Sequence, residues 1–134
     1  AGLFDGLGYS ASSKSAFVSY SAKQMSILAF ALGAKKETFG MGSQAWFGDI
    51  MTTCFGQSRN REFGEMIGKT GKVEESLEKL RTEGKTVEGY VTAKVVYDLI
   101  VKHKIEAPVI KMIYNVLYKK MSPEKFITSF IKDW

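Results

Sequence analysis

Apolar residues recur every three or four positions through most of this chain, and this spacing limits its fold more than any other feature. It is typical of amphipathic α-helices, whose buried side chains return to one face with each turn. No segment alternates apolar and polar residues for long enough to predict a strand. We therefore expect an all-α, multi-helix domain. The predicted helices run over Lys14 to Leu32, from Ser58, around Val73 to Leu80, from Val87 to before Pro108, from Pro108 and from Pro123.

Capping residues mark the ends of these predicted helices. Ser12 or Ser13 is expected to cap the first long helix, because a serine hydroxyl accepts a hydrogen bond from a free N–H of the first turn. Gly33 is expected to end that helix, since glycine favours the left-handed conformation found after helix C-termini. Ser58 and Ser122 are expected to cap two later helices, the second of which begins with a proline.

The apolar stripes also predict which side chains are buried. Glu75 and Lys79, four residues apart on one helix, are expected to form an ion pair. The predicted inward-facing residues are Val87, Val91, Val95 and Leu99; Ile110, Ile113 and Leu117; and Phe126, Ile127, Phe130 and Ile131.

Length and composition favour an ordinary globular protein. The 134 residues are enough to bury a core as one domain, residues 1–134. The apolar run from Met25 to Ala34 is too short to cross a membrane. One cysteine and no secretory signal favour a reducing, cytoplasmic setting. The net charge of +5 raises nucleic acid as a partner, but the lysines are scattered, which is typical of a solvated surface.

Two glycine-containing stretches imitate nucleotide-binding motifs without the required context. Gly40 to Ala45 matches G-x-G-x-x-A, yet it follows a predicted helix where the dinucleotide fingerprint needs a strand. Gly64 to Thr70 has three residues between its glycines where a Walker A loop has four, so Gly68 is expected to end a helix. A single histidine, His103, and a single cysteine, Cys54, predict neither a metal site nor a nucleophile.

Two arginines stand in the first turn of the helix that Ser58 is expected to cap. Positive charge at Arg59 and Arg61 opposes the helix dipole there, although exposed arginines do occur at such positions. A bound phosphate would explain them better, held by free backbone N–H groups, the Ser58 hydroxyl, the Asn60 amide and a guanidinium. Upstream, Asp49 interrupts an apolar run. Its carboxylate is either a structural partner or the partner of a cationic group supplied from elsewhere.

Four motifs in a fixed order resemble one known family: "GLFDGLG", "GDIMTTCFG", "SRNREFG" and "KTVEGYVTAK". They are similar to the C-terminal half of NAD(P)-dependent glycerol-3-phosphate dehydrogenases, from Ala1 to about Tyr118. The resemblance implies a helical substrate-binding domain of the 6-phosphogluconate dehydrogenase C-terminal-like type. It also implies that the chain is part of an oxidoreductase, which interconverts dihydroxyacetone phosphate and sn-glycerol 3-phosphate with NAD or NADP.

The resemblance further implies which residues act. In the family, Asp49 matches an aspartate that partners a catalytic lysine, which normally stands a few residues before the position of Ala1. We expect that lysine and an N-terminal Rossmann domain outside this chain, so the isolated chain is expected to be inactive. Expected partners are a small phosphate substrate, the Rossmann domain and a second subunit, with no nucleic acid, membrane or metal. The matched positions are Thr53, Ser58, Arg59 and Asn60 for the substrate, and Arg59, Thr86 and Glu88 for the cofactor.

The chain departs from the family pattern in two places. It has Ser12 to Ser15 where the family usually has N-T-K-A, so no role is assigned to Lys14. The segment "GSQAWFGD" replaces a more glycine-rich run, and Gln44 and Trp46 are expected to reshape that wall of the pocket. Two alternatives stay open. One is a basic helical module that binds nucleic acid or an acidic partner; the other is a structural domain whose expected site residues lie far apart or form internal salt bridges.

Overall fold

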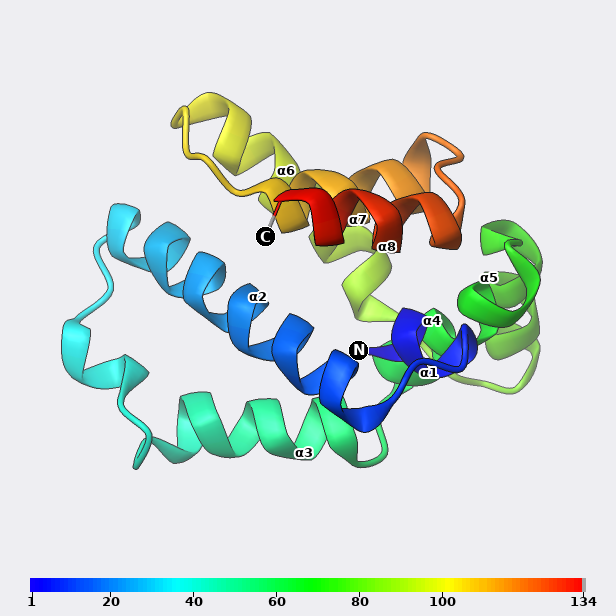
Figure 1. Cartoon of the computed structure of the whole chain (residues 1–134), viewed down its shortest axis with the longest axis horizontal. Helices are drawn as coiled ribbons and strands as arrows, with labels where there is room; N and C mark the ends of the chain where they lie inside the picture. Colours follow the sequence, from blue (N-terminus) through cyan, green and yellow to red (C-terminus); the bar gives the residue numbers. More distant parts are fainter. Residues whose placement is uncertain (134) are drawn as a thin grey trace.

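The computed structural model describes residues 1–133, which form eight α-helices, a short 3₁₀ turn and a π-helical turn (Figure 1). No strand is found among these residues, so the expected all-α class is confirmed. In chain order the elements are α1 (Gly2–Gly6), α2 (Ala11–Ala31), η1 (Lys36–Phe39), η2 (Gln44–Gly48), α3 (Asp49–Phe55), α4 (Arg59–Thr70), α5 (Val73–Thr82), α6 (Glu88–Lys102), α7 (Pro108–Tyr118) and α8 (Pro123–Asp133).

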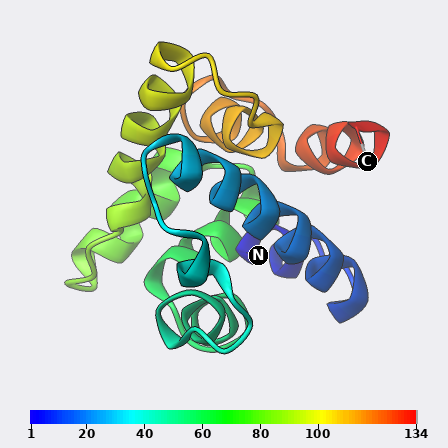
Figure 2. The same cartoon turned by 90° about the vertical axis from the view of Figure 1, so that its left-hand side faces the viewer.

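The long helix α2 lies between two groups of helices (Figures 1 and 2). On one side, α3 runs back along α2 after the chain has passed through η1 and η2. On the other side are α6, α7 and α8. The helices α1, α4 and α5 gather at the end where α2 begins, and most of the predicted site residues belong to this end of the molecule.

Four phenylalanines join α1, α2 and α8 in the core. The Phe17 ring stacks on Phe4 with ring centroids 4.8 Å apart, and it meets Phe126 and Phe130 edge-on at 5.6 and 5.1 Å. Each of the four is at most 4% exposed. Burying a side chain of this size contributes roughly 1.5–3 kcal/mol, and well-oriented ring pairs add to that. This cluster therefore holds the N-terminal and C-terminal helices of the described chain together.

The helices α1 and α4 cross so closely that their backbones require glycine. A Cβ atom at Gly6 would collide with the carbonyl oxygen of Glu65, and one at Gly68 would lie 2.8 Å from that of Leu3. The prediction that Gly68 ends a helix is therefore wrong, because it lies inside α4 at this crossing. The helix ends instead at Gly71, whose φ of 69° only glycine adopts readily.

The predicted helix ends are largely confirmed. Ser58 and Ser122 cap α4 and α8, each accepting a hydrogen bond from the third residue of its helix, at 3.5 and 3.2 Å. Gly33, with a φ of 91°, follows α2 as predicted. The cap of α2 is Ser10, which accepts a bond from the third residue at 3.2 Å, so neither of the predicted serines is the cap.

The buried face of α6 differs from the predicted stripe. Two of its members, Val91 and Val95, are 65% and 54% exposed, whereas Ile100 is 1% exposed. Ile100 packs with Leu28 of α2 and with Ala107, which precedes α7. The helix has a second apolar stripe, formed by Ala93, Val96, Tyr97 and Ile100, and the surrounding helices cover this stripe instead of the predicted one.

The last two helices are closer to the prediction. On α7 the most buried side chains stand one position before each predicted residue, and the predicted residues are half-buried. On α8 the predicted face is confirmed except at Ile131, which is 62% exposed. Glu75 pairs with Lys72 at 2.9 Å instead of with Lys79. Lys72 immediately precedes α5 and lies within reach of the Glu75 carboxylate.

Candidate functional site

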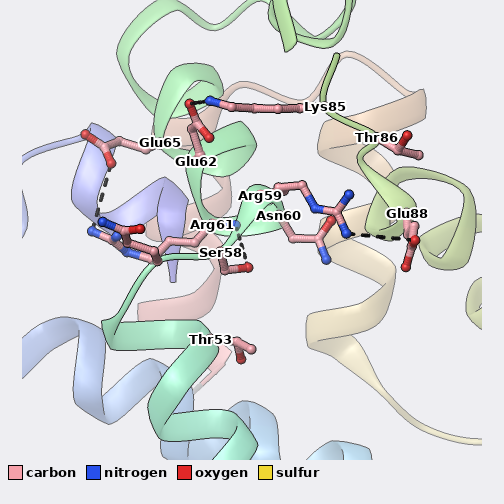
Figure 3. A pocket seen from close by; sticks show the side chains of 11 residues that line it. Thr53, Ser58, Arg59, Asn60, Arg61, Glu62, Glu65, Lys85, Thr86 and Glu88 are labelled. Carbon is pink, nitrogen blue, oxygen red and sulfur yellow. Dashed lines mark hydrogen bonds and ion pairs between the residues drawn. The ribbon is translucent and has the colours of Figure 1, made fainter. Parts of the chain in front are cut away.

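A cleft of about 710 Å³ lies between the end of α3, the start of α4 and the start of α6 (Figure 3). Pockets that hold small molecules are typically of this size, roughly 300–1,000 Å³. The structure brings six of the predicted site residues to this cleft: Thr53, Ser58, Arg59, Asn60, Thr86 and Glu88. It adds Arg61, which the sequence offered as a phosphate-binding arginine, and four residues to which the sequence assigned no role in a site: Gln57, Glu62, Glu65 and Lys85.

The start of α4 supplies backbone donors to this cleft. The Ser58 hydroxyl accepts a hydrogen bond from the N–H of Arg61. The N–H groups of Arg59 and Asn60 also belong to the first turn, which has no carbonyl acceptor within the helix. These donors and the positive end of the helix dipole make this part of the cleft attractive to an anion.

Arg59 is the cation of the cleft that the protein holds most loosely. Its Nη2 atom lies 4.0 Å from Oε1 of Glu88, and the two side chains are 55% and 75% exposed. Figure 3 shows the guanidinium reaching across the cleft toward Glu88. Such a long, solvated ion pair contributes little to stability. Most donors of Arg59 therefore remain open to a ligand.

The other two cations of the cleft have firm partners. Arg61 donates from Nε to Asp5 at 2.8 Å and from Nη1 to the carbonyl oxygen of Gly56 at 3.0 Å. Lys85 contacts Glu62 at 2.7 Å and Glu83 at 3.0 Å. These hydrogen bonds raise the pKa of Lys85, and the bond to Glu62 has the larger effect. The phosphate interpretation of the two first-turn arginines therefore applies to Arg59 and not to Arg61.

Asn60 joins the start of α4 to the start of α6. Its Oδ1 atom accepts a hydrogen bond from the backbone N–H of Gly89 at 3.0 Å. A Cβ atom at position 89 would lie 2.7 Å from that oxygen, so the contact depends on glycine. This contact keeps Thr86 and Glu88 at the rim of the cleft opposite Arg59.

Asp49 lies near the cleft without lining it. It is the first residue of α3 and is exposed, and its carbonyl oxygen accepts a hydrogen bond from the hydroxyl of Thr53 at 2.8 Å. Within residues 1–133 no lysine or arginine pairs with its carboxylate. Gln44 and Trp46, which were expected to shape the pocket wall, also lie outside the lining; Trp46 packs edge-on against Phe39 with centroids 4.8 Å apart.

Sequence reasoning missed a buried ion cluster next to the cleft. Lys14, 8% exposed, places its Nζ atom 2.7 Å from Asp5, which also binds Arg61. Burial alone would raise the pKa of Asp5, but the hydrogen bonds from Lys14 and Arg61 lower it below its ordinary value. The available signal was a lysine within the buried face that Phe17 and Val18 continue.

The single histidine and the single cysteine do not line the cleft. His103 is exposed at the end of α6, and Cys54 is half-buried against the core. In the described part of the chain no cluster of three or more histidine, cysteine or acidic residues could hold a metal ion. None of the described helices is long and apolar enough to cross a membrane.

Comparison with known proteins gives one consistent result. A family model described as "NAD-dependent glycerol-3-phosphate dehydrogenase C-terminus" matches residues 1–128. A glycerol-3-phosphate dehydrogenase [NAD(P)+] of Idiomarina loihiensis is 39% identical over 127 residues, which are 93% of this chain and 36% of the relative. A protein of the same name from Shewanella halifaxensis is 41% identical over 124 residues, 92% of this chain and 35% of the relative. The chain thus spans about a third of the length of these curated relatives.

Proposed function

The chain belongs to the family of NAD-dependent glycerol-3-phosphate dehydrogenase C-termini, and on this premise we propose that it forms the substrate-binding part of such an enzyme. The proposed reaction interconverts dihydroxyacetone phosphate and sn-glycerol 3-phosphate with NAD or NADP. The observation that carries the proposal is the exposed guanidinium of Arg59 at the capped start of α4. It gives a cleft of substrate size a cation without a firm partner.

In this proposal the substrate phosphate binds at the start of α4. The guanidinium of Arg59 offers a two-pronged set of donors, and the N–H groups of Arg59 and Asn60 add two more. Hydrogen bonds between ionised groups are the stronger kind. Because the phosphate is remote from the reacting carbon, its binding energy serves to hold the ketone in position for reaction.

The cleft residues also fit one part of a nicotinamide cofactor. The half-exposed guanidinium of Arg59 suits a cofactor phosphate, and Thr86 and Glu88 offer a hydroxyl and a carboxylate from the facing rim. When bound, the reduced cofactor supplies the hydride that adds to the ketone carbon. We propose that a Rossmann domain outside this chain makes most of the cofactor contacts, since the relatives are about three times as long.

Asp49 is proposed to orient a catalytic lysine that lies outside this chain. That lysine would donate a proton to the ketone oxygen as the carbon receives hydride, so that the alcohol forms without a free alkoxide. The support is positional: the Asp49 carboxylate is exposed one helical turn from Thr53, which lines the cleft. The complete enzyme is further proposed to be a cytoplasmic homodimer.

A nucleic-acid-binding module is the alternative that the net charge of +5 raises. Such a module needs a continuous basic face whose counterions are released on binding. The cleft is instead balanced, with as many glutamates as cations among its lining residues: Arg59, Arg61 and Lys85 against Glu62, Glu65 and Glu88. No observation favours this alternative.

The test is an activity assay of the full-length protein that contains this chain. Oxidation of NADH or NADPH is followed with dihydroxyacetone phosphate and, as the control, with dihydroxyacetone, which lacks the phosphate. We expect turnover with the phosphate ester and very little with the control. Absence of turnover with the ester, or equal turnover with both ketones, would overturn the proposal.

A further inference from the structure

An ion cluster of Asp5, Lys14 and Arg61 joins three helices beside the cleft. The carboxylate of Asp5 in α1 receives Nζ of Lys14 from α2 at 2.7 Å and Nε of Arg61 from α4 at 2.8 Å. The three side chains are only 17%, 10% and 25% exposed. Of these three residues, Arg61 is the one that also lines the cleft.

Arg61 also fixes the turn between α3 and α4 from both of its ends. Its Nη1 atom donates to the carbonyl oxygen of Gly56, the first residue of the turn, at 3.0 Å. Its backbone N–H donates to the hydroxyl of Ser58, the last residue of the turn, at 3.5 Å. The turn has only one residue between these two, so it has little freedom once both ends are held.

The end of α3 is held by the same cluster. The ammonium of Lys14 lies 5.0 Å from the ring centre of Phe55, the last residue of α3, at a distance where a cation is attracted to a ring face. A Cβ atom at Gly56 would lie 2.6 Å from the carbonyl oxygen of Thr52, so the backbone there is closely packed too. The relative placement of α3 and α4 therefore depends on contacts made by Lys14 and Arg61.

This placement decides the shape of the cleft. Thr53 faces it from α3, and Arg59 and Asn60 face it from α4 (Figure 3). Buried ion pairs often stabilise a fold no more than apolar side chains of the same size would, because removing charges from water is costly. A cluster that contacts both ends of a turn between two site-bearing helices has an additional use, which is to set their geometry.

We propose that Asp5, Lys14 and Arg61 are positioning residues that set the distance between Thr53 on α3 and the phosphate anchor on α4. The phosphate anchor is the Arg59 guanidinium together with the N–H groups of the first turn of α4. The inference rests on the proposed function, because the geometry matters for binding of the phosphate ester. None of the three residues needs to touch the substrate. The side chain of Arg61 acts through Gly56, and Asp5 acts by holding that side chain.

The decisive variant is Arg61→Lys in the full-length protein. Lysine keeps a cation beside Asp5, but it lacks the second nitrogen that reaches the carbonyl oxygen of Gly56. The matched control is Arg81→Lys, the same chemical change at an exposed pair in which Arg81 lies 3.3 Å from Glu78 on α5. The kinetic constants for dihydroxyacetone phosphate and the melting temperature are measured for both variants.

We expect Arg61→Lys to raise KM by about 10-fold, the loss that corresponds to one hydrogen bond to a charged group, with a small change in melting temperature. The control should leave KM within about 2-fold, as expected for an exposed pair. If Arg61→Lys lowers the melting temperature and leaves KM at the wild-type value, the cluster has only a structural role and the inference is wrong.

Amide hydrogen exchange of this chain gives a second measurement that needs no enzymatic activity. The N–H groups of Gly56 and Arg61 are hydrogen-bonded at the two sides of the turn, and Arg61→Lys should speed their exchange by about 10-fold while core amides keep their rates. Unchanged exchange at both amides contradicts the inference. If the unmodified full-length protein shows no turnover, the proposed function fails, and the exchange rates still decide whether Arg61 positions the turn.

Discussion

At the scale of single residues, Arg59 and Arg61 show how two arginines in one helical turn come to differ. Arg59 is 55% exposed with one weak partner, whereas Arg61 is 25% exposed and bound to Asp5. The sequence places both in the first turn of a helix capped by Ser58, and the structure confirms that placement. The sequence could not show that the two arginines have different partners, because Asp5, the partner of Arg61, lies 56 residues away in the chain.

Arg59→Ala in the full-length enzyme should weaken the use of phosphate-bearing substrates and leave the fold intact. The substitution removes a charge that opposes its own helix dipole, so the free energy of unfolding should change little. Loss of a hydrogen bond to a charged group, worth roughly 1.5–3 kcal/mol, implies a 10- to 150-fold fall in kcat/KM. Steady-state kinetics with dihydroxyacetone phosphate measure this.

Two controls make this prediction specific for phosphate. Arg59→Lys should recover only part of the loss, since an ammonium keeps the charge but not the two-pronged geometry. Dihydroxyacetone, which has no phosphate, should be turned over as poorly by Arg59→Ala as by the wild type. An equal loss on both ketones, or an unfolded variant, would contradict the role of Arg59 as the anchor of the substrate phosphate.

At the scale of helices, capping residues in the sequence predicted where helices begin and end better than apolar spacing predicted which face of a helix is buried. A cap such as Ser58 acts on the first turn of its own helix, so the sequence contains all that is needed. The buried face of α6 depends on what packs against it, and Val91 and Val95 are exposed because Leu28 and Ala107 contact the face that carries Ile100. Helix ends are therefore predictable from short segments, whereas faces require the tertiary contacts.

The crossing of α1 and α4 predicts that Gly68→Ala destabilises the protein. Alanine is favoured over glycine in a helix by about 1 kcal/mol, but the new methyl group would lie 2.8 Å from the Leu3 carbonyl oxygen, and such overpacking costs about 1–3 kcal/mol. Urea unfolding should therefore show a net loss of stability. Gly42→Ala, at a position with open space, is the control. A variant at position 68 that is more stable than the wild type would mean that the two backbones are not in close contact.

The Asp5 cluster predicts a loss of stability in acid. Because the folded-state pKa of Asp5 is below its ordinary value of 3.8, its contribution is complete above that value and is lost as the pH falls through the folded pKa. Asp5→Asn should lower the free energy of unfolding at neutral pH and flatten its decline below pH 3.8. Denaturant unfolding at several pH values measures both effects. An identical acid decline in the variant and the wild type would exclude Asp5 as a source of this decline.

At the scale of the whole molecule, six of the residues that the family resemblance grouped together line one cleft, whereas Asp49 does not line it. Thr53, Asn60 and Glu88 come from three helices, and helical periodicity alone offered no reason to group them. The resemblance gave no role for Lys14, because the surrounding segment departs from the family pattern. The contact with Asp5 that explains this lysine forms only when α1 and α2 pack together.

The 134-residue chain alone is expected to show no dehydrogenase activity. Its cleft would supply only the proposed phosphate anchor, while the catalytic lysine and the Rossmann domain are proposed to lie outside this chain. A coupled assay with the pure chain, dihydroxyacetone phosphate and NADH or NADPH tests this. Oxidation of the cofactor that depends on the ketone would contradict the proposal that the catalytic lysine and the Rossmann domain lie outside this chain.

The start of α4 is proposed to anchor the substrate phosphate. A crystal structure of the full-length protein with sn-glycerol 3-phosphate and NADH tests it most directly, because two reduced molecules form an unreactive pair. We expect the phosphate within hydrogen-bonding distance of the Arg59 guanidinium and of the first-turn N–H groups of α4, with Arg59 drawn away from Glu88. A phosphate bound elsewhere, with Arg59 still directed at Glu88, would contradict it.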